Sequence, residues 1–146
     1  MFEDYREGYF DCREGLIAHQ ANCRGSMGKG LALQIKNTYP SVYHEYRRDY
    51  FRKKLVLGEI TYTKIFEGLY IVNLMGQDHY RGKPPLTNYG ALTFCLGKLG
   101  MLSESLRLPV YVPYNLGCGL AGGDWEVVSE LIEKILPDCT ICKLPE

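Results

Sequence analysis

The chain has 146 residues, 17 of them basic and 17 acidic. A chain of this length is the size of one ordinary domain, and we expect a single domain over residues 1–146. The balanced charge, with no run of lysines or arginines, argues against general nucleic-acid binding. Because there is neither a leader-like N-terminus nor a run of about eighteen apolar residues, we expect a soluble, cytoplasmic protein with no membrane partner.

Six cysteines without an export signal indicate reduced thiols rather than a disulfide framework. Cys139 and Cys142 form a Cys-x-x-Cys pair, which is compatible with zinc binding, with redox chemistry, or with plain core packing. A structural zinc site needs a second ligand pair at matching spacing, and the sequence has none. We therefore expect core packing here, and neither a metal nor a cofactor elsewhere.

Short β-branched and aromatic segments alternate with helical patterns, which predicts an α/β domain. In chain order, we expect strands over 15–20, 59–65, 69–75 and 108–113, with a terminal strand around 139–142. The second and third strands are joined by a hairpin-like link over 66–68. Helices are predicted over 28–38, from Pro40 to Tyr50, over 87–102 and from 124 to Pro137, with Thr87 and Asp124 as N-caps of the last two.

Two strand-to-helix junctions are rich in glycine, and we call them the first glycine loop (residues 21–30) and the second glycine loop (residues 114–123). Glycine lets the backbone come close to a ligand and turn its amides inward. Amides gathered at a helix start form a natural site for phosphate or diphosphate. A lone glycine pattern often serves only a tight turn, but two matching junctions favour anion binding.

Neither loop is a standard nucleotide motif. Lys29 is followed by Gly30 and Leu31, so the first loop lacks the Ser or Thr of a P-loop. Leu33 stands where a dinucleotide fingerprint needs its third glycine.

The two loops do resemble those of a known family. Residues 17–32 (IAHQANCRGSMGKGLA) resemble the first ligand loop of macrodomains, and residues 113–126 (PYNLGCGLAGGDWE) resemble their diphosphate-binding loop. The sequence is most similar in look to small bacterial and phage macrodomains, to the terminal ADP-ribose protein glycohydrolase and to the yeast ADP-ribose phosphatase. The resemblance implies a three-layer α/β/α sandwich with a central mixed sheet and an ADP-ribose pocket at one sheet edge.

The resemblance also implies roles for individual residues. Asn22 is expected to bond the terminal ribose, and the second loop to cradle the diphosphate. Tyr9 stands where many macrodomains carry an aspartate for the adenine, and we expect its ring to stack on the base instead. The full set of expected ADP-ribose contacts is Tyr9, Phe10, Ala21, Asn22, Ser26, Met27, Gly28, Lys29, Gly30, Leu31, Asn115, Leu116, Gly117, Cys118, Gly119, Leu120, Ala121, Gly122 and Leu144.

The catalytic residues of the related glycohydrolases have no counterpart. Those enzymes use a lysine where this chain has Gly76 or Gln77, and an aspartate where it has Ala121. His19 matches a histidine of the yeast phosphatase and is the candidate general acid or base, although a buried structural role is the stronger interpretation. Cys118 is a weaker candidate nucleophile, because no partner is evident.

Three functions remain open from the sequence. The first is hydrolysis of an ADP-ribose derivative at the terminal ribose, either as an ADP-ribose 1''-phosphate phosphatase or by removing ADP-ribose from a macromolecule. The second is a reader that binds ADP-ribose without turnover. The third is RNA binding through the tyrosines at 39, 43, 46 and 50, for which core packing is the better interpretation because no basic residues are regularly interleaved on that face.

Overall fold

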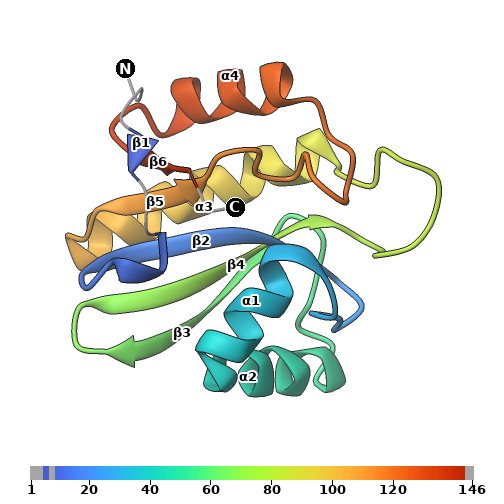
Figure 1. The fold of residues 1–146 in the computed structure, drawn as a ribbon, viewed down its shortest axis with the longest axis horizontal. Helices are drawn as coiled ribbons and strands as arrows, with labels where there is room; N and C mark the ends of the chain where they lie inside the picture. The colour runs from blue at the N-terminus through green and yellow to red at the C-terminus, as the bar shows by residue number, and fades with distance from the viewer. Residues whose placement is uncertain (1–4, 7–8, 144–146) are drawn as a thin grey trace.

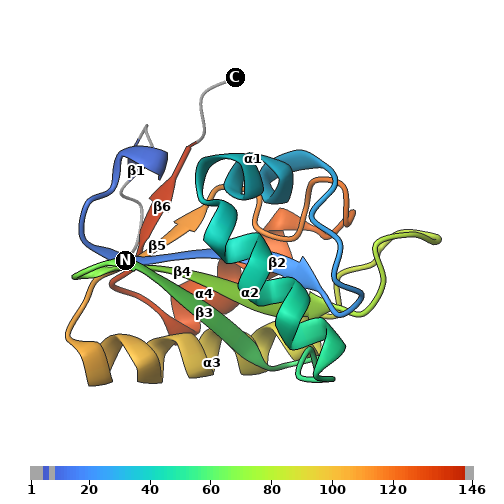
Figure 2. The same ribbon diagram turned by 90° about the horizontal axis from the view of Figure 1, so that it is seen from below.

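The computed structural model describes residues 5–6 and 9–143 and has a six-stranded sheet with helices on both faces (Figures 1 and 2). Residues Tyr9–Asp11 form a short 3-10 helix. The strands are β1 (Tyr5–Arg6), β2 (Gly15–Asn22), β3 (Ile60–Phe66), β4 (Leu69–Gln77), β5 (Val110–Pro113) and β6 (Thr140–Cys142). The helices are α1 (Gly30–Thr38), α2 (Pro40–Phe51), α3 (Tyr89–Leu106) and α4 (Trp125–Ile135).

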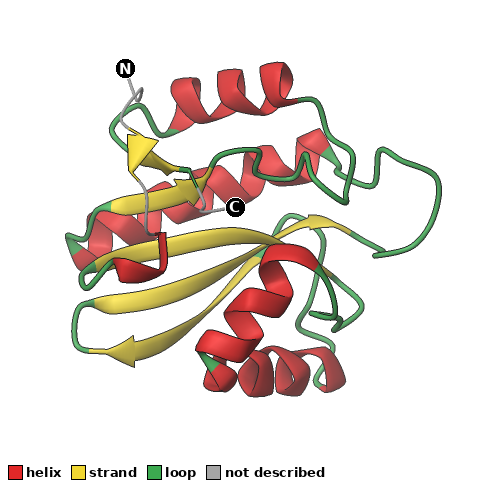
Figure 3. Cartoon of the chain, in the orientation of Figure 1, coloured by secondary structure: helices red, strands yellow, loops and turns green. Residues whose placement is uncertain are grey.

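The sheet is mixed, as predicted. Its strand order is β1-β6-β5-β2-β4-β3, and every neighbouring pair is parallel except β3 and β4. Those two form the predicted hairpin, whose turn contains Gly68 at a φ of 86°. The carboxyl ends of β2, β4 and β5 therefore lie at one edge of the sheet, where α/β proteins place their ligands (Figure 3).

Alternating residues of β2 bury both faces of the sheet. Leu16 and Ala18 pack with the apolar sides of α3 and α4, whereas Ile17 and Ala21 pack with those of α1 and α2. The sheet is thus the middle of three layers, with two helices on each side (Figure 2). The α/β/α sandwich predicted from the sequence is confirmed.

Of the two predicted N-caps, one is confirmed and one is wrong. Asp124 caps α4 as expected, because its side chain accepts a hydrogen bond from the Glu126 amide. The prediction of Thr87 as the cap of α3 was wrong by one residue. Asn88 caps that helix by accepting from the Ala91 amide, and Thr87 instead donates its hydroxyl proton to a neighbouring loop.

The tyrosines and the terminal cysteines contribute to the core. Tyr46 is fully buried and Tyr43 and Tyr50 are half-buried against the same cluster, which confirms packing rather than an open stacking face. Cys139 and Cys142 are buried at β6, and burial raises the pKa of the Cys139 thiol to about 12. Within the described residues, no helix has the length and apolar character that crossing a membrane requires.

Candidate functional site

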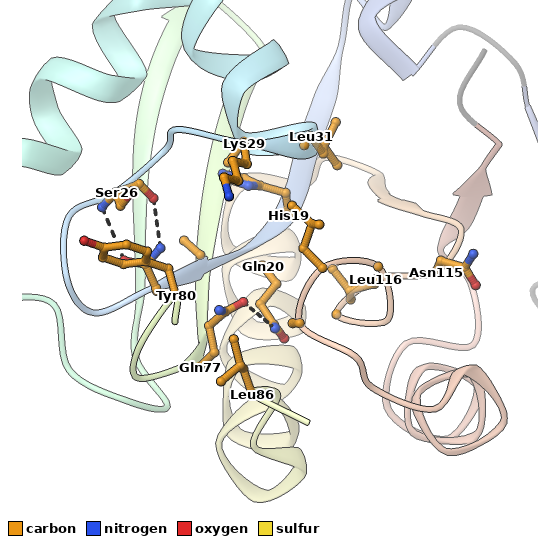
Figure 4. A pocket seen from close by; sticks show the side chains of 18 of the residues that line it. His19, Gln20, Ser26, Lys29, Leu31, Gln77, Tyr80, Leu86, Asn115 and Leu116 are labelled. Atoms are coloured by element: carbon orange, nitrogen blue, oxygen red, sulfur yellow. Dashed lines mark hydrogen bonds between the residues drawn. The ribbon is translucent and has the colours of Figure 1, made fainter. Parts of the chain in front are cut away.

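A cavity of about 770 Å³ opens at the sheet edge formed by the carboxyl ends of β2, β4 and β5. One wall is the first glycine loop with the start of α1, and another is the second glycine loop after β5. A third is the loop over residues 78–86, which we call the arm and which projects beyond the sheet after β4 (Figure 1). Figure 4 shows how side chains from these segments surround the cavity.

Asn22 organises the first glycine loop. Its Oδ1 accepts hydrogen bonds from the amides of Arg24 at 2.9 Å and Ser26 at 3.3 Å, and its Nδ2 donates to the Ser26 carbonyl at 2.8 Å. Tyr46 of α2 donates its hydroxyl proton to the Asn22 carbonyl at 2.5 Å. These bonds fix the turn and leave one Nδ2 hydrogen of Asn22 without an acceptor among the described residues.

The start of α1 presents free backbone amides. Lys29 is the N-cap residue and makes no side-chain capping bond. The N–H groups of Gly30, Leu31 and Ala32 have no acceptor among the described residues, as expected for the first turn of a helix. All three residues line the cavity, so this helix start offers hydrogen-bond donors and a positive dipole end to a bound anion.

The second glycine loop presents a second row of amides. Its turns are closed by hydrogen bonds from the Cys118 amide to the Asn115 carbonyl at 2.8 Å and from the Gly122 amide to the Gly119 carbonyl at 3.0 Å. The N–H groups of Gly119, Leu120 and Ala121 have no acceptor within the described part of the chain, and all three residues line the cavity. Consecutive free amides of this kind form an anion-binding concavity.

The two rows lie close together, and the cavity carries positive charge. A Cβ built on Gly30 would lie 3.2 Å from the Cδ1 of Leu120, so the two loops meet at that point. Of the described residues that line the cavity, Lys29 and Arg81 are the charged ones. Although the whole chain is neutral, the cavity is therefore locally suited to an anion.

His19 lies beside the cavity in a buried polar row across three strands. Its Nε2 is 2.6 Å from the Oδ1 of Asn73, its register partner on β4, and Asn73 Nδ2 donates to Thr61 of β3 at 3.1 Å. His19 is only 1% exposed, and burial lowers its pKa to about 4. Because the Asn73 oxygen only accepts, Nε2 carries the proton, and Nδ1 has no partner among the described residues.

Most residues expected from the sequence do line the cavity. They are His19, Ala21, Asn22, Ser26, Gly28, Lys29, Gly30, Leu31, Asn115, Leu116, Gly117, Gly119, Leu120 and Ala121.

Five expected residues are not part of the lining, and one lies outside the described residues. Tyr9 is 1% exposed and donates its hydroxyl proton to the Ala18 carbonyl at 2.7 Å, so the expected stacking of its ring on a base is not available. Cys118 is a poor nucleophile here, because burial raises its thiol pKa to about 11. Phe10, Met27 and Gly122 also lie outside the lining, and Leu144 falls outside the described residues.

Sequence reasoning missed several lining residues. Three of the missed residues lie at the carboxyl ends of strands: Gln20, Gln77 and Pro113. Because ligand-facing residues of α/β proteins occupy such positions, the same rule would have identified these three. No pattern in the sequence of the arm predicted that it lines the cavity, because the path of the arm depends on contacts with distant segments. The missed residues are Gln20, Ala32, Gln77, Tyr80, Arg81, Gly82, Leu86, Pro113 and Tyr114.

Sequence comparison finds relatives of this chain. A Mycobacterium tuberculosis protein named DNA ADP-ribosyl glycohydrolase is 32% identical over 128 residues, covering 84% of this chain and 36% of that protein. An Aspergillus clavatus ADP-ribose 1''-phosphate phosphatase is 31% identical over 85 residues, covering 58% of this chain and 32% of that protein. The chain thus spans about a third of the length of these relatives.

A solved structure also matches this chain. The macrodomain of Mycobacterium tuberculosis DarG superposes with a TM-score of 0.78 and 28% identity, covering 98% of this chain and 97% of that one. The family model described as the Macro domain matches residues 18–132, a span that contains both glycine loops and the arm. On the sequence match, the fold and the two amide rows together, this chain belongs to the macro domain family.

Proposed function

We propose that this chain binds ADP-ribose in the cavity and hydrolyses a derivative of ADP-ribose at the terminal ribose. The observation that carries the proposal is the pair of amide rows, residues 30–32 and 119–121, which line one cavity and have no acceptors of their own among the described residues. A diphosphate supplies the charged oxygens that such rows bind. The volume of about 770 Å³ is within the usual range for a nucleotide-sized ligand.

The terminal ribose is expected at the Asn22 end of the cavity. Asn22 is 7% exposed, lines the cavity and keeps one Nδ2 hydrogen that no acceptor among the described residues takes. The turn around it is held by Tyr46 and by the Arg24–Asp78 ion pair at 3.1 Å, so the amide is already oriented before a ligand arrives. Such preorganisation lowers the entropic cost of binding a flexible ribose.

Hydrolysis is supported by the names of the relatives and by one residue of this chain. Both matched relatives are named as hydrolases of ADP-ribose derivatives. His19 is neutral at pH 7, because burial lowers its pKa to about 4, and its Nδ1 lone pair is suited to accept a proton or a hydrogen bond. Since the ring is 1% exposed, contact of His19 with substrate requires the ring to be more accessible than it is in this structure.

A reader without turnover is the alternative, and a specific observation favours it. This chain has Gly76 or Gln77 where the related glycohydrolases carry a lysine, and Ala121 where they carry an aspartate. Binding through the amide rows does not depend on either group. The two functions share one cavity and differ only in chemistry at the terminal ribose.

Turnover assays separate the two functions. The protein is incubated with ADP-ribose 1''-phosphate and, separately, with an ADP-ribosylated DNA oligonucleotide, and released phosphate or ADP-ribose is measured. Hydrolysis predicts release that falls strongly in Asn22→Ala and His19→Ala but not in Asn37→Ala, a control on the exposed side of α1. Binding without release from either substrate supports the reader, and release that is unchanged in both site variants refutes the assigned site.

A further inference from the structure

A chain of hydrogen bonds centred on Gln20 links three separate segments at the cavity. Gln20 Nε2 donates to Gln77 Oε1 at 2.9 Å and to Thr87 Oγ1 at 2.8 Å. The Thr87 hydroxyl in turn donates to the Gly117 carbonyl at 2.6 Å, which also accepts from the Gly123 amide at 3.0 Å. One amide of β2 therefore connects both ends of the arm with the second glycine loop, and Figure 4 shows Gln20 and Gln77 pointing toward one another.

Glycines at positions 76 and 117 leave the space that this amide occupies. A Cβ on Gly76 would overlap Gln20 Oε1, and a Cβ on Gly117 would lie 2.8 Å from the same atom. Gln20 Oε1 is buried and has no hydrogen-bond donor among the described residues. A buried oxygen without a donor is unfavourable, and an apolar side chain of equal length would avoid it. The two bonds that Gln20 Nε2 donates are what such an apolar side chain would lose.

The arm and the second glycine loop are also joined directly. The Leu86 amide donates to the Ala121 carbonyl at 2.7 Å, and a Cβ on Gly122 would lie 2.8 Å from the Cβ of Pro84. The end of the arm thus rests on the loop that carries one of the two amide rows. Gln20, which belongs to β2, connects the arm and the second glycine loop to the sheet through its bonds to Gln77 and Thr87.

We propose that Gln20 is a positioning residue that couples the second glycine loop to the arm, so that a ligand held by the loop also orders the arm. The coupling of the two segments belongs to the ligand-free fold, and its use by a ligand rests on the proposed function. Tyr80 and Arg81 of the arm line the cavity, so ordering the arm places an aromatic and a cationic side chain beside the bound molecule. By reciprocity, fixing the arm strengthens binding to the loop.

The first test is hydrogen exchange measured by mass spectrometry on the ligand-free protein. Gln20→Met keeps the length of the side chain and removes both donated bonds, and Gln34→Met on the exposed side of α1 is the matched control. Pro84 and Pro85 have no amide hydrogen, so the segment 84–88 reports only its last three amides. We expect Gln20→Met to speed exchange about fivefold or more in both 84–88 and 115–122, with no change in the control.

The second test adds ADP, which has the diphosphate but no terminal ribose. In the wild type ADP should slow exchange in both segments. In Gln20→Met the Leu86–Ala121 bond remains, so ADP should still slow exchange in 115–122 but should protect 84–88 less than it does in the wild type. Unchanged exchange in ligand-free Gln20→Met, or protection of 84–88 by ADP equal to that in the wild type, would overturn the proposal.

The two proposals fail in different ways. If neither ADP nor ADP-ribose protects the wild type, the proposed function fails, while the ligand-free comparison still decides the role of Gln20. If Gln20→Met does not fold, Thr87→Val breaks the next link of the same chain and must speed exchange in 115–122 to sustain the proposal.

Discussion

Gly119 is the position where a single change tests the amide rows with the least disturbance of the fold. A Cβ built there meets no atom within 4 Å, and Gly119 is not among the glycines with positive φ, so a side chain is accommodated without strain. Gly119 lines the cavity. Gly97 of α3 has equally open space and lies outside the cavity lining, which makes it a matched control.

The effect of Gly119→Glu on ADP-ribose binding follows from simple electrostatics. A carboxylate about 5 Å from one phosphate charge, at an effective dielectric constant of about 20, is repelled by about 3 kcal/mol. That energy corresponds to a loss of affinity of about a hundredfold. Gly119→Gln has nearly the same size without the charge, so comparison of the two variants separates repulsion from steric blocking.

Calorimetric titration with ADP-ribose, together with thermal unfolding of each variant, measures this effect. We expect Gly97→Glu to bind as the wild type does, Gly119→Gln to bind more weakly, and Gly119→Glu to bind most weakly, with unfolding temperatures close to that of the wild type. If Gly119→Glu binds ADP-ribose as tightly as Gly97→Glu does, the diphosphate does not lie on the second glycine loop and the reasoning is refuted.

Three further predictions concern the free energy of unfolding, measured by urea denaturation. Burial lowers the pKa of His19 from 6.5 to about 4, so between these values the unfolded chain binds a proton that the folded chain does not, and stability falls as the pH falls. His19→Gln should therefore lose about 2 kcal/mol less than the wild type between pH 7 and pH 5, and equal losses would contradict the burial of a neutral ring. Tyr46→Phe leaves the Asn22 carbonyl without its donor and should cost about 1 to 2 kcal/mol and weaken ADP-ribose binding; unchanged stability would mean that this bond is unimportant. Asn88→Ala removes the side-chain cap of α3 and should lower the free energy of unfolding by about 1 kcal/mol. An unchanged free energy of unfolding would mean that Asn88 is not the cap and would favour Thr87.

The regular elements were predictable because each has a local signal. The apolar pattern of α4 and its Asp124 cap, or the short apolar segment in β2, depends only on neighbouring residues, and the predicted bounds of these elements lie within a few residues of the observed ones. The two glycine loops were also predictable, because each combines a strand end, clustered glycines and a helix start. Their place on one cavity follows from parallel strand pairing.

Features that depend on distant contacts were not predictable. No residue near Tyr9 in the sequence indicates that its ring is buried, because the acceptor of its hydroxyl proton, the Ala18 carbonyl, belongs to β2. The residues next to Thr87 in the sequence favour it as a helix cap, but its hydroxyl donates a hydrogen bond to the Gly117 carbonyl, 30 residues later in the chain. The role of Gln20 depends on three segments that meet only in the folded chain.

The central claim, that two rows of free backbone amides bind ADP-ribose, is tested most directly by an NMR titration that follows each backbone N–H. We expect saturable binding with a Kd below about 1 mM, and the largest shifts at residues 30–32 and 119–121. Absence of shifts at millimolar ADP-ribose in a folded protein, or shifts confined to other surfaces, would contradict it.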